Sequence, residues 1–123
     1  MDKKFQRTII AYKNYFLDFF HGQNEKVQEK ISWTIDLVKT LEFIPNKYFE
    51  HLSSTTGIFE IRIEVGSNIY RIFTCFDQGN LVILMNGFQK KTQKTPKKEI
   101  EKAERIKAEY FSEKLKELES KKK

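Results

Sequence analysis

Basic side chains gather near the end of one apolar run of this sequence. Between residues 88 and 98 there are five lysines and no acidic residue: Lys90, Lys91, Lys94, Lys97 and Lys98. Two arginines, Arg62 and Arg71, lie in strand-like segments further upstream. Such cations bind phosphate oxygens. Neighbouring positive charges disfavour the charged form of a lysine, so a lysine of this group could also be partly neutral and transfer a proton.

The excess positive charge is confined to one end of the chain. Residues 1–88 contain ten Lys or Arg and ten Asp or Glu, whereas residues 89–123 contain thirteen basic and seven acidic residues. The net charge of +6 therefore lies entirely after Phe88. A polyanion such as RNA, DNA or an acidic membrane surface is the natural partner class for such a segment.

Both groups of cations also have a purely structural interpretation. Lysine runs are usually solvated surface. Arg71 follows Tyr70 within an apolar run, where an unpaired arginine is costly to bury, so it needs an anion or an ion pair with Glu60 or Glu64 across a hairpin. The turn sequence "VGSNI" does not determine whether Arg62 and Arg71 face the same way.

Several other chemistries are poorly supported by the residue types. His21 and His51 are the only histidines and stand thirty residues apart, with no further ligand at metal-binding spacing. Cys75 is the only cysteine, which excludes an internal disulfide and favours a packed thiol. No glycine-rich phosphate loop and no Ser-His-Asp or Cys-His pattern is evident. A metal site is therefore not predicted.

The first half of the chain predicts one strand followed by helical segments. We expect a strand near 5–12, a helical turn that packs Phe16, Leu17, Phe19 and Phe20 inward and ends at Gly22, a helix over 24–42 with Asn24 as its N-cap, and a short helical piece after Pro45 that carries Tyr48, Phe49 and Leu52. The apolar stripe of the long helix comprises Val27, Ile31, Ile35, Leu37 or Val38, and Leu41.

The second half predicts a β-meander and a final helix. Alternation in "GIFEIRIEV", the turn "GSN", the run "IYRIFTCF", the turn "DQGN" and the apolar run "LVILMNGF" indicate three antiparallel strands. A helix over 95–118 follows, with Thr95 and Pro96 at its start. Its apolar stripe either covers the sheet or docks a partner. The pattern predicts an α+β protein with one domain over 1–123, a frayed end at 119–123 and, because no long apolar segment exists, a cytoplasmic location.

Residues 59–103 resemble the phage-derived branch of the RelE/HigB toxins. Members of that branch commonly show an "E-hydrophobic-R" strand, a "YR" strand and a "GF-x-KKT-x-K-TP-x-x-E-I" stretch, and this chain has "FEIRI", "IYRIF" and "GFQKKTQKTPKKEI" at the matching places. The resemblance implies a RelE-like fold, with a twisted antiparallel sheet of about four strands, N-terminal helices packed on it and a C-terminal helix.

The resemblance also implies an activity and partners. It suggests the toxin of a type II toxin–antitoxin system, a ribosome-dependent mRNA endoribonuclease that inhibits translation without a metal or other cofactor. The chemistry would be attack of the ribose 2′-OH on the adjacent phosphate, stabilised by cations. The expected partners are mRNA on the ribosome and a cognate helix-turn-helix (HigA-like) antitoxin, with no membrane and no small-molecule cofactor.

The same resemblance assigns roles to individual residues. Arg62 and Arg71 would hold the scissile phosphate, and Lys90 and Lys91 would bind phosphate or transfer a proton; the other RNA-binding candidates are Tyr70, Asn86, Thr92, Lys94, Lys97 and Lys98. Tyr70 could stack on a base or belong to the core. Many relatives have histidine where this chain has Asn86, so an acid-base role is lost there. Charge reversal at Arg71 or Lys91 is expected to abolish toxicity without unfolding.

Two other functions agree with the same residues. A non-catalytic RNA- or ribosome-binding protein would block translation by occupancy, and the missing histidine favours it. An interaction protein would use the C-terminal helix to dock a partner, with the lysines as solubilising surface. The first class predicts salt-dependent RNA binding without new RNA ends, and the second predicts little affinity for RNA.

Overall fold

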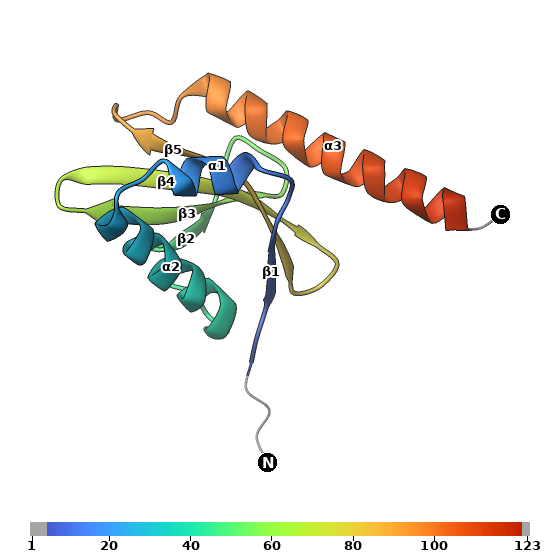
Figure 1. The fold of residues 1–123 in the computed structure, drawn as a ribbon, viewed down its shortest axis with the longest axis horizontal. Helices are drawn as coiled ribbons and strands as arrows, with labels where there is room; N and C mark the ends of the chain where they lie inside the picture. The colour runs from blue at the N-terminus through green and yellow to red at the C-terminus, as the bar shows by residue number, and fades with distance from the viewer. Residues whose placement is uncertain (1–4, 122–123) are drawn as a thin grey trace, which may run out of the picture.

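The computed structural model describes residues 5–121 and shows a five-stranded sheet with helices on both faces (Figure 1). The elements are β1 (Thr8–Ala11), α1 (Tyr15–His21), α2 (Glu25–Thr40), β2 (Phe49–His51), β3 (Ile58–Val65), β4 (Asn68–Asp77), β5 (Leu81–Lys90) and α3 (Lys97–Lys121). The strand order is β1-β5-β4-β3-β2, with β1 parallel to β5 and every other pair antiparallel. The predicted α+β class is confirmed, with one strand more than the four expected.

Each face of the sheet carries its own apolar cluster. Ile61, Ile63, Tyr70 and Ile72 belong to the cluster that packs against α1 and α2. Strand neighbours point to opposite faces, so Ile58, Phe73, Cys75, Ile83 and Met85 form a second cluster with Ala103 and Ile106 of α3. The Cys75 thiol is buried in this second cluster, as expected, and burial raises its pKa to about 11. The final helix therefore covers part of the sheet, which was one of its two predicted uses.

The helix α2 follows its sequence signals closely. The Asn24 Oδ1 accepts a hydrogen bond from the Val27 backbone N at 3.0 Å, which confirms the predicted N-cap. Val27, Ile31 and Val38 are buried. The helix ends at Thr40, so Leu41 lies beyond it and is exposed. In α1, Phe16 is buried as expected, whereas Leu17 is exposed because it points away from the sheet.

The predicted helical piece around residues 48–52 is wrong. Residues Phe49–His51 form β2, which pairs antiparallel with β3 and places Phe49 opposite Ile61 and His51 opposite Phe59. The Phe49 ring stacks on the Phe59 ring with a centroid distance of 5.2 Å and an interplanar angle of 5°. The unpaired edge of β3 and this aromatic contact are tertiary features, and they override a helical preference that was only local.

The helix α1 lies directly on β5 because residue 87 is glycine. A Cβ atom at Gly87 would stand 2.7 Å from Cγ and 2.8 Å from Cε2 of Phe19, far inside van der Waals contact. The Phe19 ring, in turn, lies 6.4 Å from the Tyr70 ring, centroid to centroid. Gly87 thus allows α1 to approach the strand that leads to the lysine cluster.

Substitution Gly87→Ala is therefore expected to lower the free energy of unfolding by about 1–3 kcal/mol, the usual range for overpacking. Urea denaturation followed by circular dichroism would measure it. The control is Gly22→Ala, since Gly22 has φ −79° and a Cβ there would lie 3.4 Å from the nearest atom. A Gly87→Ala protein as stable as the wild type would show that Phe19 can move away without loss.

Polar contacts hold the first two thirds of α3 against the sheet. The Asn86 Nδ2 donates to the backbone O and to Oε1 of Glu99, both at 3.1 Å. Further along, the buried Asp77 accepts hydrogen bonds from the Tyr110 OH at 2.6 Å and the Lys114 Nζ at 2.7 Å. The C-terminal end of the helix extends past the sheet (Figure 1), and Leu115 and Leu118 near that end are exposed.

The Asp77 contact gives a pH-dependent contribution to stability. Burial by itself raises the pKa of the Asp77 carboxyl, but the hydrogen bonds from Lys114 and Tyr110 outweigh burial and the net pKa is lowered. A carboxyl whose pKa is lower in the folded protein contributes its full stability above the unfolded value of about 3.9. That contribution disappears as the pH falls through the folded pKa.

We expect Asp77→Asn to lower the free energy of unfolding at pH 7 by about 2 kcal/mol, a typical value for hydrogen bonds to a charged group. The difference from the wild type should shrink as the pH is lowered from 4 toward 2, which urea titrations at several pH values would show. Glu119→Gln, on the exposed end of α3, is the matched control. If the free energies of unfolding of Asp77→Asn and the wild type differed equally at pH 7 and pH 2, the charge of Asp77 would not be the source of that difference.

The ends of the chain differ slightly from expectation. The strand predicted near 5–12 is confined to Thr8–Ala11. The helix predicted over 95–118 extends over Lys97–Lys121. The frayed end predicted over 119–123 stays a prediction, and residues 122–123 lie outside the described part. Between residues 5 and 121, no helix combines the length and apolar character needed to cross a membrane.

Candidate nucleic-acid interface

Two arginines face each other across the hairpin of β3 and β4. Arg62 and Arg71 are direct Cα partners in the antiparallel ladder, and their side chains leave the same face of the sheet. This is the face on which α3 packs. Arg71, Phe73 and Cys75 are every second residue of β4 and so share one face, and Phe73 and Cys75 belong to the cluster that includes α3. Two like charges directly opposite each other repel, so this pair requires anions nearby.

Two glutamates supply the negative charge. The Glu60 Oε1 lies 3.3 Å from the Arg71 Nε and 3.5 Å from the Arg62 Nε. The Glu50 Oε2 accepts a hydrogen bond from the Arg62 Nη1 at 3.0 Å. The predicted alternative of an ion pair between Arg71 and Glu60 is thereby confirmed. Glu50 escaped the sequence analysis because its segment was expected to be helical, although in β2 it is the Cα partner of Glu60.

The two arginines differ sharply in access to solvent. The Arg71 side chain is 5% exposed, whereas the Arg62 side chain is 32% exposed. Burial lowers the pKa of Arg71, and the adjacent Glu60 opposes that shift. The expectation that both arginines hold a phosphate directly is thus not met for Arg71, because β-sheet neighbours and Glu60 enclose it. Arg62 is the member of the pair that an incoming ligand can reach.

The ion pair of Arg71 and Glu60, next to Arg62, is incompletely hydrogen-bonded. Among the described residues, neither the buried Arg71 Nε nor the buried Glu60 Oε2 has a hydrogen-bond partner, although Arg71 Nη1 donates to the Tyr70 carbonyl O at 3.2 Å. The Arg71 Nε is close to Glu60 Oε1 but not aligned with it. A buried donor without an aligned acceptor is costly, so the burial of Arg71 depends on the charge of the adjacent Glu60.

The lysines extend this face toward the start of α3. Lys90, the last residue of β5, is the Cα partner of Ile69, two residues before Arg71 on β4. From strand spacing and rise per residue, the Cα atoms of Lys90 and Arg71 are roughly 8 Å apart on the same face. Lys91, Thr92 and Lys94 lie exposed in the loop before α3, and Lys97 and Lys98 begin the helix.

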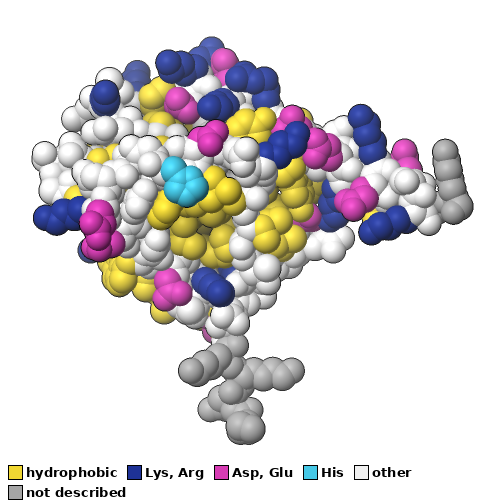
Figure 2. Space-filling view, viewed as in Figure 1, with side chains coloured by type: hydrophobic (Ala, Val, Ile, Leu, Met, Phe, Trp, Pro, Cys, Tyr) yellow, Lys and Arg dark blue, Asp and Glu magenta, His cyan; other side chains and the backbone are white. Residues whose placement is uncertain are grey.

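The lysine cluster carries the uncompensated charge of the site. Glu50 and Glu60 balance Arg62 and Arg71, but within residues 5–121 no ion pair involves any of the five lysines at 90, 91, 94, 97 and 98. Figure 2 shows Lys and Arg side chains along the edge of the molecule where α3 begins. The positive end of the α3 dipole lies at the same place and adds to the potential there.

Three predicted RNA contacts have other roles in the structure. Tyr70 is 4% exposed and belongs to the core beneath α1, on the opposite face from Arg71, so the core interpretation is confirmed and base stacking is not supported. Asn86 is 1% exposed and holds Glu99 of α3, which removes it from any surface contact. The Thr92 Oγ1 donates to the Lys94 carbonyl O at 2.8 Å and so shapes the lysine loop.

An α+β architecture with helices on both faces of an open five-stranded sheet is consistent with the RelE-like fold. The family described as phage derived protein Gp49-like (DUF891) matches residues 18–108, which include the arginine pair and all five lysines. This match spans well over half of the chain, and the protein belongs to that Gp49-like family, which is of the RelE/HigB toxin type. No curated protein matches the sequence.

Proposed function

We propose that this protein is the toxin of a type II toxin–antitoxin system, of the HigB-like branch, and that it cleaves mRNA on the ribosome. The observation that carries the proposal is the accessible Arg62 next to a buried, incompletely bonded Arg71 on the neighbouring strand, with five lysines on the adjoining segment that are in no ion pair among residues 5–121. Family membership supports a toxin-like role. A cytoplasmic location and a helix-turn-helix antitoxin of the HigA-like type follow from the same proposal.

The proposed chemistry is cleavage by the RNA itself. The ribose 2′-OH attacks the adjacent phosphorus, a 2′,3′-cyclic phosphate forms, and the bond to the 5′ oxygen of the next nucleotide breaks. Arg62 holds the phosphate, and the charge of the buried Arg71, on the neighbouring strand, adds to the stabilisation of the developing negative charge. Lys90 or Lys91 binds phosphate or delivers the proton to the leaving 5′ oxygen. The half-exposed Glu50 carboxylate, 3.0 Å from Arg62, is a candidate acceptor for the 2′-OH proton.

A second candidate function is translation inhibition by occupancy. Asn86 stands where many relatives have histidine, and its amide is engaged with Glu99 instead of facing the arginine pair. If that histidine supplies essential acid-base chemistry in the relatives, this protein would bind the ribosome or its message without cutting it. The basic surface serves both functions equally.

The deciding experiment adds the purified protein to a reconstituted translation reaction with a defined message and maps RNA ends by primer extension. Matched reactions omit ribosomes, or contain EDTA at a magnesium level that keeps ribosomes intact. New ends that require ribosomes and survive EDTA are the expected result. Arrested translation with intact message would overturn the nuclease and favour occupancy, and unimpaired translation would overturn both.

A further inference from the structure

A second aromatic and basic surface lies beyond the arginine pair, at the open edge of β3. Lys26, Lys30 and Trp33 follow each other at intervals of four and three residues, which places them on one flank of α2. Lys47 and Tyr48 precede β2, and Glu64 and Val65 end β3. Neither the family match nor the sequence motifs draw attention to this surface.

Two adjoining cavities form a groove between these elements. The first, of about 430 Å³, is lined by Lys30, Lys47, Tyr48, Arg62 and Glu64. The second, of about 450 Å³, is lined by Lys26, Glu29, Lys30, Trp33, Glu64 and Val65. Lys30 and Glu64 line both cavities, so the two are continuous. Because Arg62 lines the first cavity, the groove opens at the accessible member of the arginine pair.

The groove contains two aromatic rings in an edge-to-face arrangement, each with a lysine over it. Trp33 is 47% exposed, and its ring meets the Tyr48 ring at 74° with a centroid distance of 5.6 Å. The Lys30 Nζ lies 4.3 Å from the Trp33 ring centroid, and the Lys47 Nζ lies 5.2 Å from that of Tyr48. Exposed aromatic faces combined with mobile cations are the features by which proteins hold single-stranded nucleic acid.

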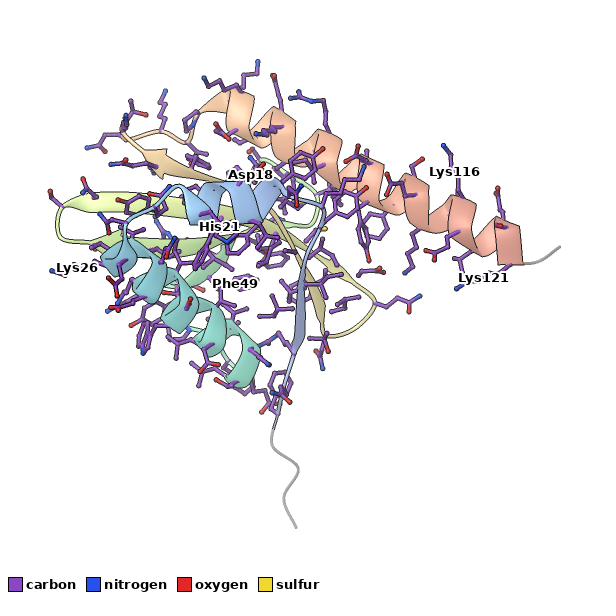
Figure 3. All side chains as sticks on the ribbon, viewed as in Figure 1. Asp18, His21, Lys26, Phe49, Lys116 and Lys121 are labelled. Atoms are coloured by element: carbon purple, nitrogen blue, oxygen red, sulfur yellow. The ribbon has the colours of Figure 1, made fainter. Side chains whose placement is uncertain are left out.

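We infer that this groove is a subsite for one or two nucleotides of single-stranded RNA next to the scissile phosphate. A base stacks on Trp33, with Tyr48 at its edge, and Lys30 and Lys47 turn to the flanking phosphates. Four cations against two carboxylates in the groove favour a polyanion over an acidic peptide segment. Lys26, in the first turn of α2 (Figure 3), lines the second cavity and so extends the track beyond the cavity that Arg62 lines.

This inference rests on the proposed function, because it takes RNA as the ligand, but its test is independent of cleavage. Trp33 is the only tryptophan of the chain, so its fluorescence reports on the groove alone. The probe is a 2′-O-methyl pentanucleotide, which binds without offering a free 2′-OH. We expect saturable quenching of Trp33, with an affinity that falls as salt rises.

Variants test which residues make the contact. With a fluorescein-labelled probe and anisotropy, Trp33→Ala should weaken binding roughly 5- to 100-fold, the range expected from loss of one stacked base, and Trp33→Phe should retain most of the affinity. Lys30→Gln and Lys47→Gln should each weaken binding several-fold, whereas Lys39→Gln, in the last turn of α2, should not. Trp33 is half-exposed, so these proteins are expected to fold.

The failure of this inference can be told apart from the failure of the proposed function. Binding that is lost in Arg62→Gln but unchanged in Trp33→Ala, with no quenching, would overturn the subsite and leave the proposed function standing. Absence of binding to the wild-type protein would overturn the subsite and count against the RNA ligand itself. Quenching by the purified antitoxin but not by RNA would assign the groove to a protein partner instead.

Discussion

Replacement of Arg62 by glutamine is expected to reduce the proposed ribosome-dependent mRNA cleavage by roughly 100-fold or more, the typical effect of removing one charge-stabilising donor from a transition state. Arg62 is the arginine that a phosphate can reach, with its side chain 32% exposed. The protein should stay folded, because the partner that loses its direct hydrogen bond is the half-exposed Glu50, and such ion pairs contribute about 1 kcal/mol or less. Timed primer extension measures the rate, and urea denaturation confirms the fold.

The matched control removes a positive charge far from the site. Lys116 and Lys121 lie on the part of α3 that extends past the sheet (Figure 3), so Lys121→Gln lowers the net charge equally without touching the arginine pair. Its cleavage rate should equal that of the wild type. A folded Arg62→Gln protein that cleaves at the wild-type rate would show that the phosphate binds elsewhere.

Replacement of Arg71 by glutamine is expected to lower the free energy of unfolding by about 3–5 kcal/mol, the usual result of removing one partner from a buried ion pair. Glu60 is 7% exposed and would keep its charge with only the more exposed Arg62, 3.5 Å away, beside it. Charge reversal at Arg71 should destabilise further, because it would bring two carboxylates together. On the sequence alone, we expect charge reversal at Arg71 or Lys91 to leave the protein folded. The burial of Arg71 argues against this for Arg71, whereas charge reversal at the exposed Lys91 should leave the fold intact.

The double variant Glu60→Gln/Arg71→Gln separates loss of charge pairing from loss of packing. If the loss of one of the two cations beside the Glu60 carboxylate is the main cost, the double variant should be more stable than Arg71→Gln alone, and a double-mutant cycle in urea would give a coupling energy of the order of 1–3 kcal/mol. An Arg71→Gln protein as stable as the wild type would contradict the buried ion pair. Loss of toxicity in an Arg71 variant can be assigned to the site only after this measurement.

The structure also changes which residues stand closest to the proposed chemistry. Sequence motifs pointed to Tyr70 and Asn86, yet both are buried in packing roles, while Glu50 and Glu60 contact the arginines directly. The motif "E-hydrophobic-R" contained Glu60, but nothing local indicated that Glu50 would be its neighbour. Only the pairing of β2 with β3 brings these two carboxylates to the same place.

The sequence by itself determined the elements and the location of the excess charge. The apolar spacing and Asn24 cap of α2, the alternation in β3 and the stripe of α3 express interactions between residues at most a few positions apart, which a sequence displays directly. The lysine cluster is equally visible, because its members are neighbours along the chain. These parts of the fold and site were predicted with nearly correct boundaries.

Only the tertiary structure decided how those elements present their side chains. The register of β3 against β4 places Arg62 opposite Arg71, and a shift of one residue would have sent one of them to the core face occupied by Tyr70. The formation of β2, the burial of Asn86 under α3 and the groove at Trp33 likewise depend on contacts between segments far apart in the chain. Strand pairing is selected by the burial of whole faces at once, and no local pattern encodes it.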